Sequence, residues 1–204
     1  LGSEGDESRD VKTLQAIAQK SGTIGVAYAL GANIDASATR NWNNGKGFFP
    51  IGYGSFGNGV LLYENFAGLG HTVDQLFIDR PSRTGVGLIG NIEQNSQYYI
   101  RNIGLINVDI RGKENVGGLA GTALQAIFDS YVTGKVRGET NVGGLAGANG
   151  ARIKDSYAAV DVQGIENVGG LVGKKGSHTI TSSYATGSVR GADKVGGLVG
   201  LNES

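Results

Sequence analysis

The sequence predicts an all-β solenoid, and three observations support this fold class. A glycine-rich phrase of six residues occurs at residues 116–121, 142–147, 168–173 and 195–200, with starts 26, 26 and 27 residues apart. A fixed period of this length is typical of stacked coils. No apolar stretch between the glycines is long enough for an amphipathic helix. Short runs such as residues 108–111 instead alternate Val or Ile with charge, which is typical of a half-buried strand.

Three segments are expected along the chain. Residues 1–20 form an N-terminal tail and a capping helix, because apolar side chains recur there at helical spacing after a possible cap at Asp10. Residues 21–99 form irregular coils with lateral loops. Residues 100–204 form regular coils of about 26 residues. The helix is expected to cover the open end of the first coil, since solenoid ends need such covers.

Within the regular coils, equivalent residues are expected to form ladders. With about three short strands per coil, the coils stack ~4.8 Å apart. Two aliphatic ladders are predicted to face inward: Ile110, Val136, Val162 and Val189, and Leu119, Leu145, Leu171 and Leu198. An outward ladder alternates in charge: Asp109, Lys135, Asp161 and Ser188. The copy at residues 100–112 is one residue longer, and Leu105 is aligned with the tyrosines of the later copies: Tyr131, Tyr157 and Tyr184.

The entry to each glycine-rich phrase carries a further polar ladder. Asn115, Asn141 and Asn167 are expected to stack there and to satisfy turn backbone groups, with Lys194 interrupting the series. The paired glycines that follow are interpreted as supplying either a positive φ or a close approach between coils.

The composition excludes several classes of function. The 37 glycines are periodic and only 2 prolines occur, which argues against disorder. The absence of cysteine excludes disulfides, metal-thiolate sites and a thiol nucleophile. A formal net charge of zero gives no indication of nucleic-acid binding, and no apolar stretch is long enough to span a membrane. We therefore expect no cofactor, no metal, no nucleic acid and a monomer. The lack of methionine indicates a piece excised from a longer protein.

The order of motifs resembles a known family. The tract at residues 30–52, the phrase at residues 68–72 and the following Gly-Leu-x-Gly repeats are similar to filamentous-haemagglutinin-like exoproteins of two-partner secretion. The repeats themselves look like the GLUG motif. This resemblance implies a right-handed parallel β-helix, secretion to the surface of a Gram-negative bacterium through an outer-membrane transporter partner, and adhesion to a host. Capture of a host haem-carrier protein such as hemopexin is the alternative that it implies.

Three catalytic interpretations are weaker than structural ones. Residues 85–90 spell G-x-G-x-x-G, but no helical pattern follows and the phrase aligns with the repeats, so it is interpreted as a repeat relic. Asp129 and Asp155 lie one coil apart, as the carboxylates of a β-helix lyase or glycosidase would, but a turn ladder explains them better. His71 is interpreted as a structural hydrogen-bonding residue and His178 as part of an exposed turn.

The sequence therefore predicts a non-enzymatic adhesin segment that binds a host protein or glycan. The aromatic residues are unevenly spread and concentrate in the irregular half. Large aromatic side chains that occur once can anchor a specific interface, whereas near-identical coils present near-identical surfaces. The predicted partner-binding residues are Trp42, Phe48, Phe49, Phe56 and Tyr63. A local hydrophobic cluster that closes a lateral loop is the competing explanation.

Overall fold

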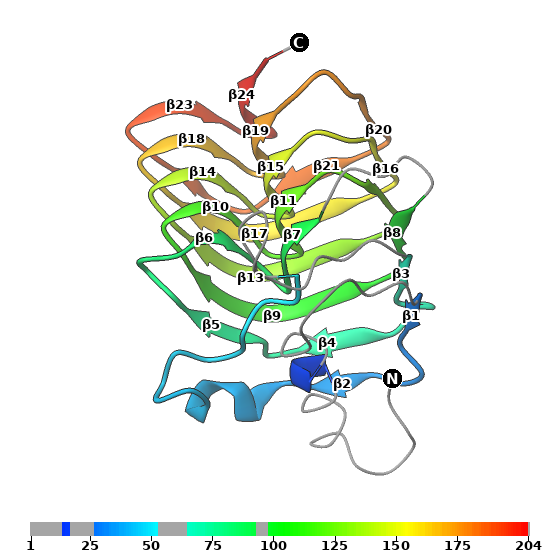
Figure 1. Cartoon of the computed structure of the whole chain (residues 1–204). Coiled ribbons are helices and arrows are strands. Elements are labelled where there is room, and N and C mark those ends of the chain that lie inside the picture. Colours follow the sequence, from blue (N-terminus) through cyan, green and yellow to red (C-terminus); the bar gives the residue numbers. More distant parts are fainter. Residues whose placement is uncertain (1–13, 17–26, 53–64, 93–97, 204) are drawn as a thin grey trace.

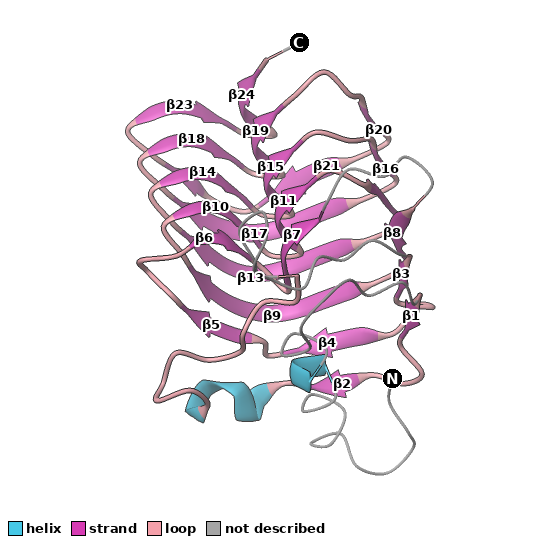
Figure 2. Cartoon of the chain, viewed as in Figure 1, coloured by secondary structure: helices cyan, strands magenta, loops and turns pink. Residues whose placement is uncertain are grey.

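The computed structural model describes residues 14–16, 27–52, 65–92 and 98–203, and these form one stacked parallel β-helix (Figure 1). From residue 66 onward every coil contributes strands to four sheets, one more than the three strands per coil expected from the sequence. The secondary structure is nearly all strand and loop (Figure 2). The predicted fold class is confirmed.

Each sheet is built from the same segment of successive coils. Sheet 1 contains β1 (Tyr28–Ala29), β3 (Phe66–Ala67), β8 (Tyr99–Arg101), β12 (Ala126–Phe128), β16 (Ile153–Lys154) and β20 (Ile180–Thr181). Sheet 2 contains β2 (Ile34–Asp35), β4 (Thr72–Asp74), β5 (Phe77–Asp79), β9 (Gly104–Arg111), β13 (Tyr131–Arg137), β17 (Tyr157–Gln163), β21 (Tyr184–Thr186) and β22 (Val189–Arg190).

The other two sheets carry the glycine-rich phrase. Sheet 3 contains β6 (Thr84–Val86), β10 (Glu114–Gly117), β14 (Thr140–Gly143), β18 (Glu166–Gly169) and β23 (Asp193–Gly196). Sheet 4 contains β7 (Ile89–Ile92), β11 (Ala120–Ala123), β15 (Ala146–Asn149), β19 (Val172–Lys175) and β24 (Val199–Asn202). Residues 85–86 belong to β6 and residues 89–90 to β7, with a bend between them. Val86 pairs with Val116, so the G-x-G-x-x-G phrase is part of the repeat.

The predicted inward ladders are confirmed up to the last coil, where Val189 is half-buried and Leu198 is 37% exposed. Val136 pairs with Ile110 on one side and with Val162 on the other, and all three side chains are buried. The N–H of Leu119 donates to the carbonyl of Leu145, and Leu145 donates to Leu171 in the same way. Each coil thus covers the apolar residues of its neighbour, which explains why one coil alone would not be stable.

The corner between sheets 1 and 2 consists of three polar ladders. Asp129 and Asp155 adopt a left-handed turn conformation, with φ of 47° and 50°. The Ser156 hydroxyl oxygen accepts the Ser130 N–H at 3.2 Å. The next residues are tyrosines: Tyr157 stacks on Tyr131 at 4.9 Å between ring centroids, and Tyr184 stacks on Tyr157 at 5.0 Å. Partial burial, and then the two neighbouring phenols, raise the pKa of Tyr157.

The first tyrosine of this stack corrects the predicted alignment. Tyr131 pairs with Gly104, and Leu105 pairs with the buried Val132, so Leu105 does not occupy a tyrosine position. The Tyr131 ring lies over Gly104, where a Cβ would come within 2.8 Å of its Cε1. The extra residue of this coil is accommodated at Asn107, which has a positive φ of 53°.

The asparagine ladder explains what the paired glycines do. Asn115, Asn141 and Asn167 all have φ between 52° and 54°, so asparagine and not glycine supplies the left-handed residue of the turn. The amides of Asn141 and Asn167 each also donate to the amide oxygen of the asparagine one coil below, at 2.7 Å. The glycines allow close approach between coils, because a Cβ on Gly118 would lie 2.7 Å from the carbonyl oxygen of Gly144.

The start of the chain departs from this regular pattern. Residues 14–16 are helical and the Leu14 side chain is fully buried, in agreement with the predicted N-terminal helix. After β2, the chain forms the 3-10 helix η1 (Ser37–Asn41), which the sequence analysis did not predict. Arg40 of η1 lies over the Phe77 ring at 4.4 Å and pairs with Asp109 at 3.5 Å. No described helix is long and apolar enough to cross a membrane.

Candidate functional site

The aromatic segment that follows η1 lies on the coil above it. Gly47 forms an antiparallel bridge with Ile78, and Ile51 forms a parallel bridge with Ile89. The N–H of Phe48 donates to the carbonyl oxygen of Phe77 at 2.9 Å. A Cβ on Gly47 would collide with the Phe77 backbone, so this contact requires glycine. The main chain of this segment, residues 42–52, is therefore attached to the solenoid at several points.

A buried arginine holds the same segment from the second coil. Arg80 is only 7% exposed, and its Nε donates to the carbonyl oxygen of Phe48 at 3.1 Å. Its Nη2 reaches the Gly47 carbonyl oxygen at 3.4 Å. The Arg80 guanidinium also lies 4.7 Å from the centre of the Phe49 ring. Gln15 of the N-terminal helix completes the support, because its side-chain amide exchanges two hydrogen bonds with the Phe49 backbone, at 2.8 and 3.2 Å.

The predicted partner-binding residues fall into three groups. Trp42 and Phe49 are half-buried and pack against the core, with part of each ring open to solvent. Phe48 is completely buried, so its ring belongs to the core and offers no accessible surface. This corrects the prediction for Phe48 and agrees with the competing explanation of a local hydrophobic cluster. Phe56 and Tyr63 lie outside the described residues. Binding through Trp42 and Phe49 stays a prediction.

The carboxylate and histidine candidates have structural surroundings. Asp129 and Asp155 are exposed, and the Asp155 carboxylate pairs with Lys154 of its own turn at 3.2 Å. His71 Nδ1 lies 3.3 Å from the Asn33 Oδ1, which also accepts the Thr72 N–H. Among the residues that the structure describes, no group of three or more His, Cys, Asp or Glu side chains could hold a metal ion.

Of the hollows that the described residues line, two have similar volumes. One, of about 330 Å³, lies at the corner between sheets 2 and 3, where Arg111 and Arg137 line it. Both arginines already have carboxylate partners, Asp79 at 4.0 Å and Asp109 respectively. The other, of about 290 Å³, lies on the outer side of sheet 1. Its residues come from four successive coils, and we call it the sheet 1 groove.

The sequence analysis did not find the sheet 1 groove. It is lined by Tyr99, Ala126, Phe128, Gly150, Arg152 and His178. These residues are not part of the aromatic cluster in the irregular half, and they do not repeat from coil to coil. One signal in the sequence could have indicated the groove. The position of Tyr99 is occupied by Ala126 in the next coil and by Arg152 in the coil after that, so this ladder changes residue type at every step.

Comparisons with known proteins agree with the repeat architecture. The family model for the GLUG motif matches residues 138–163, which run from the end of one sheet 2 strand to the end of the next. The chain is 35% identical to Halomucin of Haloquadratum walsbyi over 129 residues, which is 60% of the chain. That match spans only 1% of the length of Halomucin. The GLUG-type repeat predicted from the sequence is thus confirmed within residues 138–163.

A solved structure has the same fold. A Bacteroides ovatus protein, provisionally named an immunoglobulin A1 protease, superposes with a TM-score of 0.72 over 97% of this chain. The two sequences are 21% identical, so the likeness shows the fold alone, and the match spans 60% of the solved chain. Membership of the filamentous-haemagglutinin-like exoproteins stays a prediction, because these matches support the GLUG repeat and the β-helix only.

Proposed function

We propose that this chain is a segment of an extracellular, non-enzymatic surface protein that adheres to a host protein or glycan through residues 42–52. The GLUG match and the mucin-type name of the Halomucin relative support an extracellular location. Two-partner secretion from a Gram-negative bacterium is the matching export route and belongs to the same proposal.

The observation that carries the binding role is the support of Phe49. Arg80 lies against its ring and Gln15 fixes its backbone, while part of the ring faces solvent. Arg83 approaches the same ring, at 5.4 Å from its centre. An aromatic side chain that is held in place loses little conformational entropy on binding, which is the property of an interface anchor.

The proposal is tested with beads coated with the purified chain and applied to host epithelial cells and extracellular matrix. The double variant Trp42→Ser/Phe49→Ser should lose at least nine-tenths of the adherent beads. The matched control is Tyr184→Ser, which removes an aromatic ring that is 54% exposed on the regular coils and should leave adhesion unchanged. Circular dichroism confirms that each variant is folded. Adhesion that survives the double change, or that falls equally with the control, contradicts the proposal.

A second measurement separates this proposal from the enzymatic alternative. The purified chain is incubated with pectin, alginate and hyaluronan, and new reducing ends or unsaturated products are counted. No turnover is expected. Turnover that depends on Asp129 and Asp155 would instead indicate a polysaccharide lyase or glycosidase. Haem capture is tested separately, by titration with hemopexin, and would replace adhesion as the function if hemopexin bound stoichiometrically through Phe49.

A further inference from the structure

The sheet 1 groove is produced by one small residue between two large ones. Tyr99 of β8 pairs with Ala126 of β12, and Arg152 lies directly before β16 in the coil above. Neighbouring strands are about 4.8 Å apart, so a column of large side chains would fill this surface. The methyl group of Ala126 leaves the middle of the column open, and Gly150 adds no side chain at the rim.

Aromatic rings form one wall of the groove. Tyr99 and Phe128 are half-buried, their centroids are 6.2 Å apart and their planes are inclined at 51°. Two inclined rings form a shallow apolar angle and do not cover each other completely. A pyranose ring presents apolar C–H faces and a rim of hydroxyl groups, so its flat face can rest on such a wall. A volume of about 290 Å³ lies at the lower end of ligand sites and suits one or two sugar units.

Two arginines near the groove, Arg152 and Arg101, have no carboxylate partner among the described residues. Arg152 is exposed, and no Asp or Glu of the described chain lies within ion-pair distance of it or of Arg101. The Arg101 guanidinium rests on the Tyr99 ring, 4.9 Å from its centre. The other hollow differs on this point, since its Arg111 and Arg137 are already paired. The groove therefore has charge complementarity for an anion that the protein does not itself supply.

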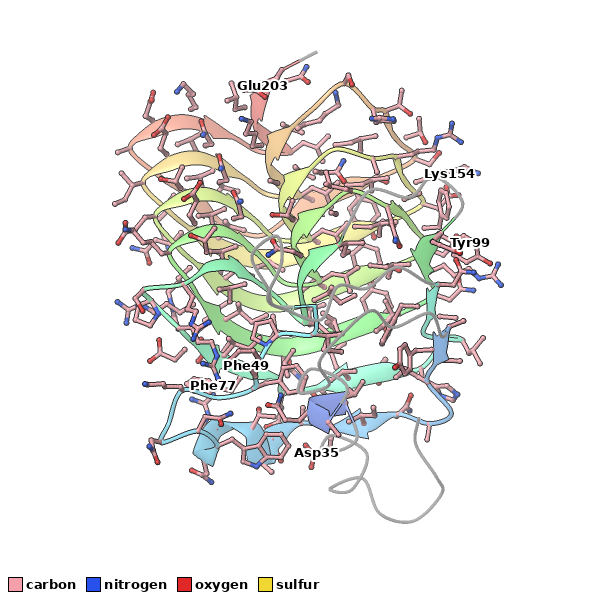
Figure 3. All side chains as sticks on the ribbon, in the orientation of Figure 1. Asp35, Phe49, Phe77, Tyr99, Lys154 and Glu203 are labelled. Atoms are coloured by element: carbon pink, nitrogen blue, oxygen red, sulfur yellow. The ribbon has the colours of Figure 1, made fainter. Side chains whose placement is uncertain are left out.

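We propose that the sheet 1 groove binds a carboxylate-bearing sugar unit of an acidic polysaccharide. The C–H face of the sugar packs on Tyr99 and Phe128, and the planar guanidinium of Arg152 binds the carboxylate through two parallel hydrogen bonds. His178 lies at the rim, where its ring can exchange a hydrogen bond with a hydroxyl group. Residues 42–52 do not line the groove, and Figure 3 places Tyr99 at the right-hand edge of the view and Phe49 lower and to the left, so this site is separate from residues 42–52.

The proposal does not depend on the adhesive role of residues 42–52. Uronic acids and sialic acids share the chemistry of a pyranose ring with a carboxylate, and the probes distinguish between them. Tetragalacturonate and sialyllactose are titrated into the protein at low salt, with the uncharged cellotetraose as the control ligand. At least one acidic probe is expected to bind at least tenfold more tightly than cellotetraose, and added NaCl should weaken that binding.

The two histidines locate the site without any substitution. The chain contains only His71 and His178, so their ring signals are resolved in an NMR spectrum. The signals of His178 should shift on titration with the acidic probe, while those of His71, which lies beside Asn33, should not. Shifts at His71 alone, or at neither ring, would overturn the proposal.

Substitutions then test the two parts of the site. Arg152→Gln should weaken the binding of the acidic probe at least tenfold. Arg190 is an exposed arginine of sheet 2, and the matched control Arg190→Gln should change the affinity less than twofold. Tyr99→Leu should weaken the binding of the acidic probe at least fivefold. Equal effects of Arg152→Gln and Arg190→Gln, equal affinity for cellotetraose, or no binding of either acidic probe at millimolar concentration would each disprove the assignment.

Discussion

The regular coils and the irregular start are stabilised in different ways. In the regular coils each contact recurs one coil away, as with the amides of Asn115, Asn141 and Asn167. Around residues 42–52 the contacts occur once, and Arg80 makes several of them. Repeated contacts fix a strand register because every coil repeats the same constraint. Contacts that occur once can hold a surface that differs from all the others, which a specific binding site requires.

The largest effect is expected from a charge in the repeated core. Val136→Asp places an unpaired carboxylate between Ile110 and Val162, where Val136 is fully buried, and should cost several kcal/mol. Lys135→Ala, on the exposed side of the same strand, should cost well under 1 kcal/mol. Urea denaturation followed by circular dichroism measures both values. Similar costs would mean that the strand faces are assigned the wrong way round.

A smaller loss of folding stability is expected from a substitution in the middle of the asparagine ladder. Asn141→Ala removes two hydrogen bonds and places a Cβ-bearing residue without a polar side chain at φ 53°, so it should cost about 2–4 kcal/mol. Asn141→Gly loses the same hydrogen bonds but tolerates the left-handed conformation, so it should cost about 1 kcal/mol less than alanine. If alanine proved as stable as glycine, the left-handed conformation would not be what selects asparagine here.

Loss of a contact that occurs once should destabilise the irregular start before it destabilises the regular coils. Arg80→Met removes hydrogen bonds to the carbonyl oxygens of Gly47 and Phe48 and should cost about 1–3 kcal/mol. Arg80→Lys keeps a cation near Phe49 but lacks the planar guanidinium, so an intermediate loss is expected. Trp42 is the single tryptophan, and its fluorescence reports this region alone. In Arg80→Met, the midpoint temperature followed by Trp42 fluorescence should be lower than the midpoint temperature followed by circular dichroism. Coincident transitions would show that the two regions unfold as one unit.

The smallest expected effect is a gain in folding stability from a substitution at the end of the asparagine ladder. The Oδ1 of Asn167 is buried and has no hydrogen-bond partner, because Lys194 occupies the next position and its ammonium group binds Glu166 instead, at 2.8 Å. Lys194→Asn should supply the missing amide donor in the same left-handed turn, where Lys194 has φ 49°. The hydrogen bond should stabilise the fold by about 1 kcal/mol, less the small contribution of the exposed ion pair. Lys194→Gln is the matched control, and a gain with glutamine but not with asparagine would contradict the ladder.

The periodic parts of the fold could be predicted from the sequence. The 26-residue period determines which residues lie above one another, and the alternation of Val136 with Lys135 determines which face each side chain takes. Both depend on residues close in sequence or exactly one coil apart. The predicted alignment of Leu105 with the tyrosines was wrong because one extra residue breaks the period. Only the backbone at Asn107 shows where that residue is accommodated.

The tertiary structure alone decided where the candidate sites lie. Phe48 and Phe49 are adjacent identical residues, yet one ring is buried and the other residue is partly exposed, and the side chains that hold their backbone, Arg80 and Gln15, come from distant parts of the chain. The sheet 1 groove likewise combines Tyr99, Ala126 and Arg152 from three coils. The period brings these residues together, but whether they leave a hollow depends on side-chain volumes across neighbouring coils. Packing between coils determines this, and no single segment of the sequence encodes it.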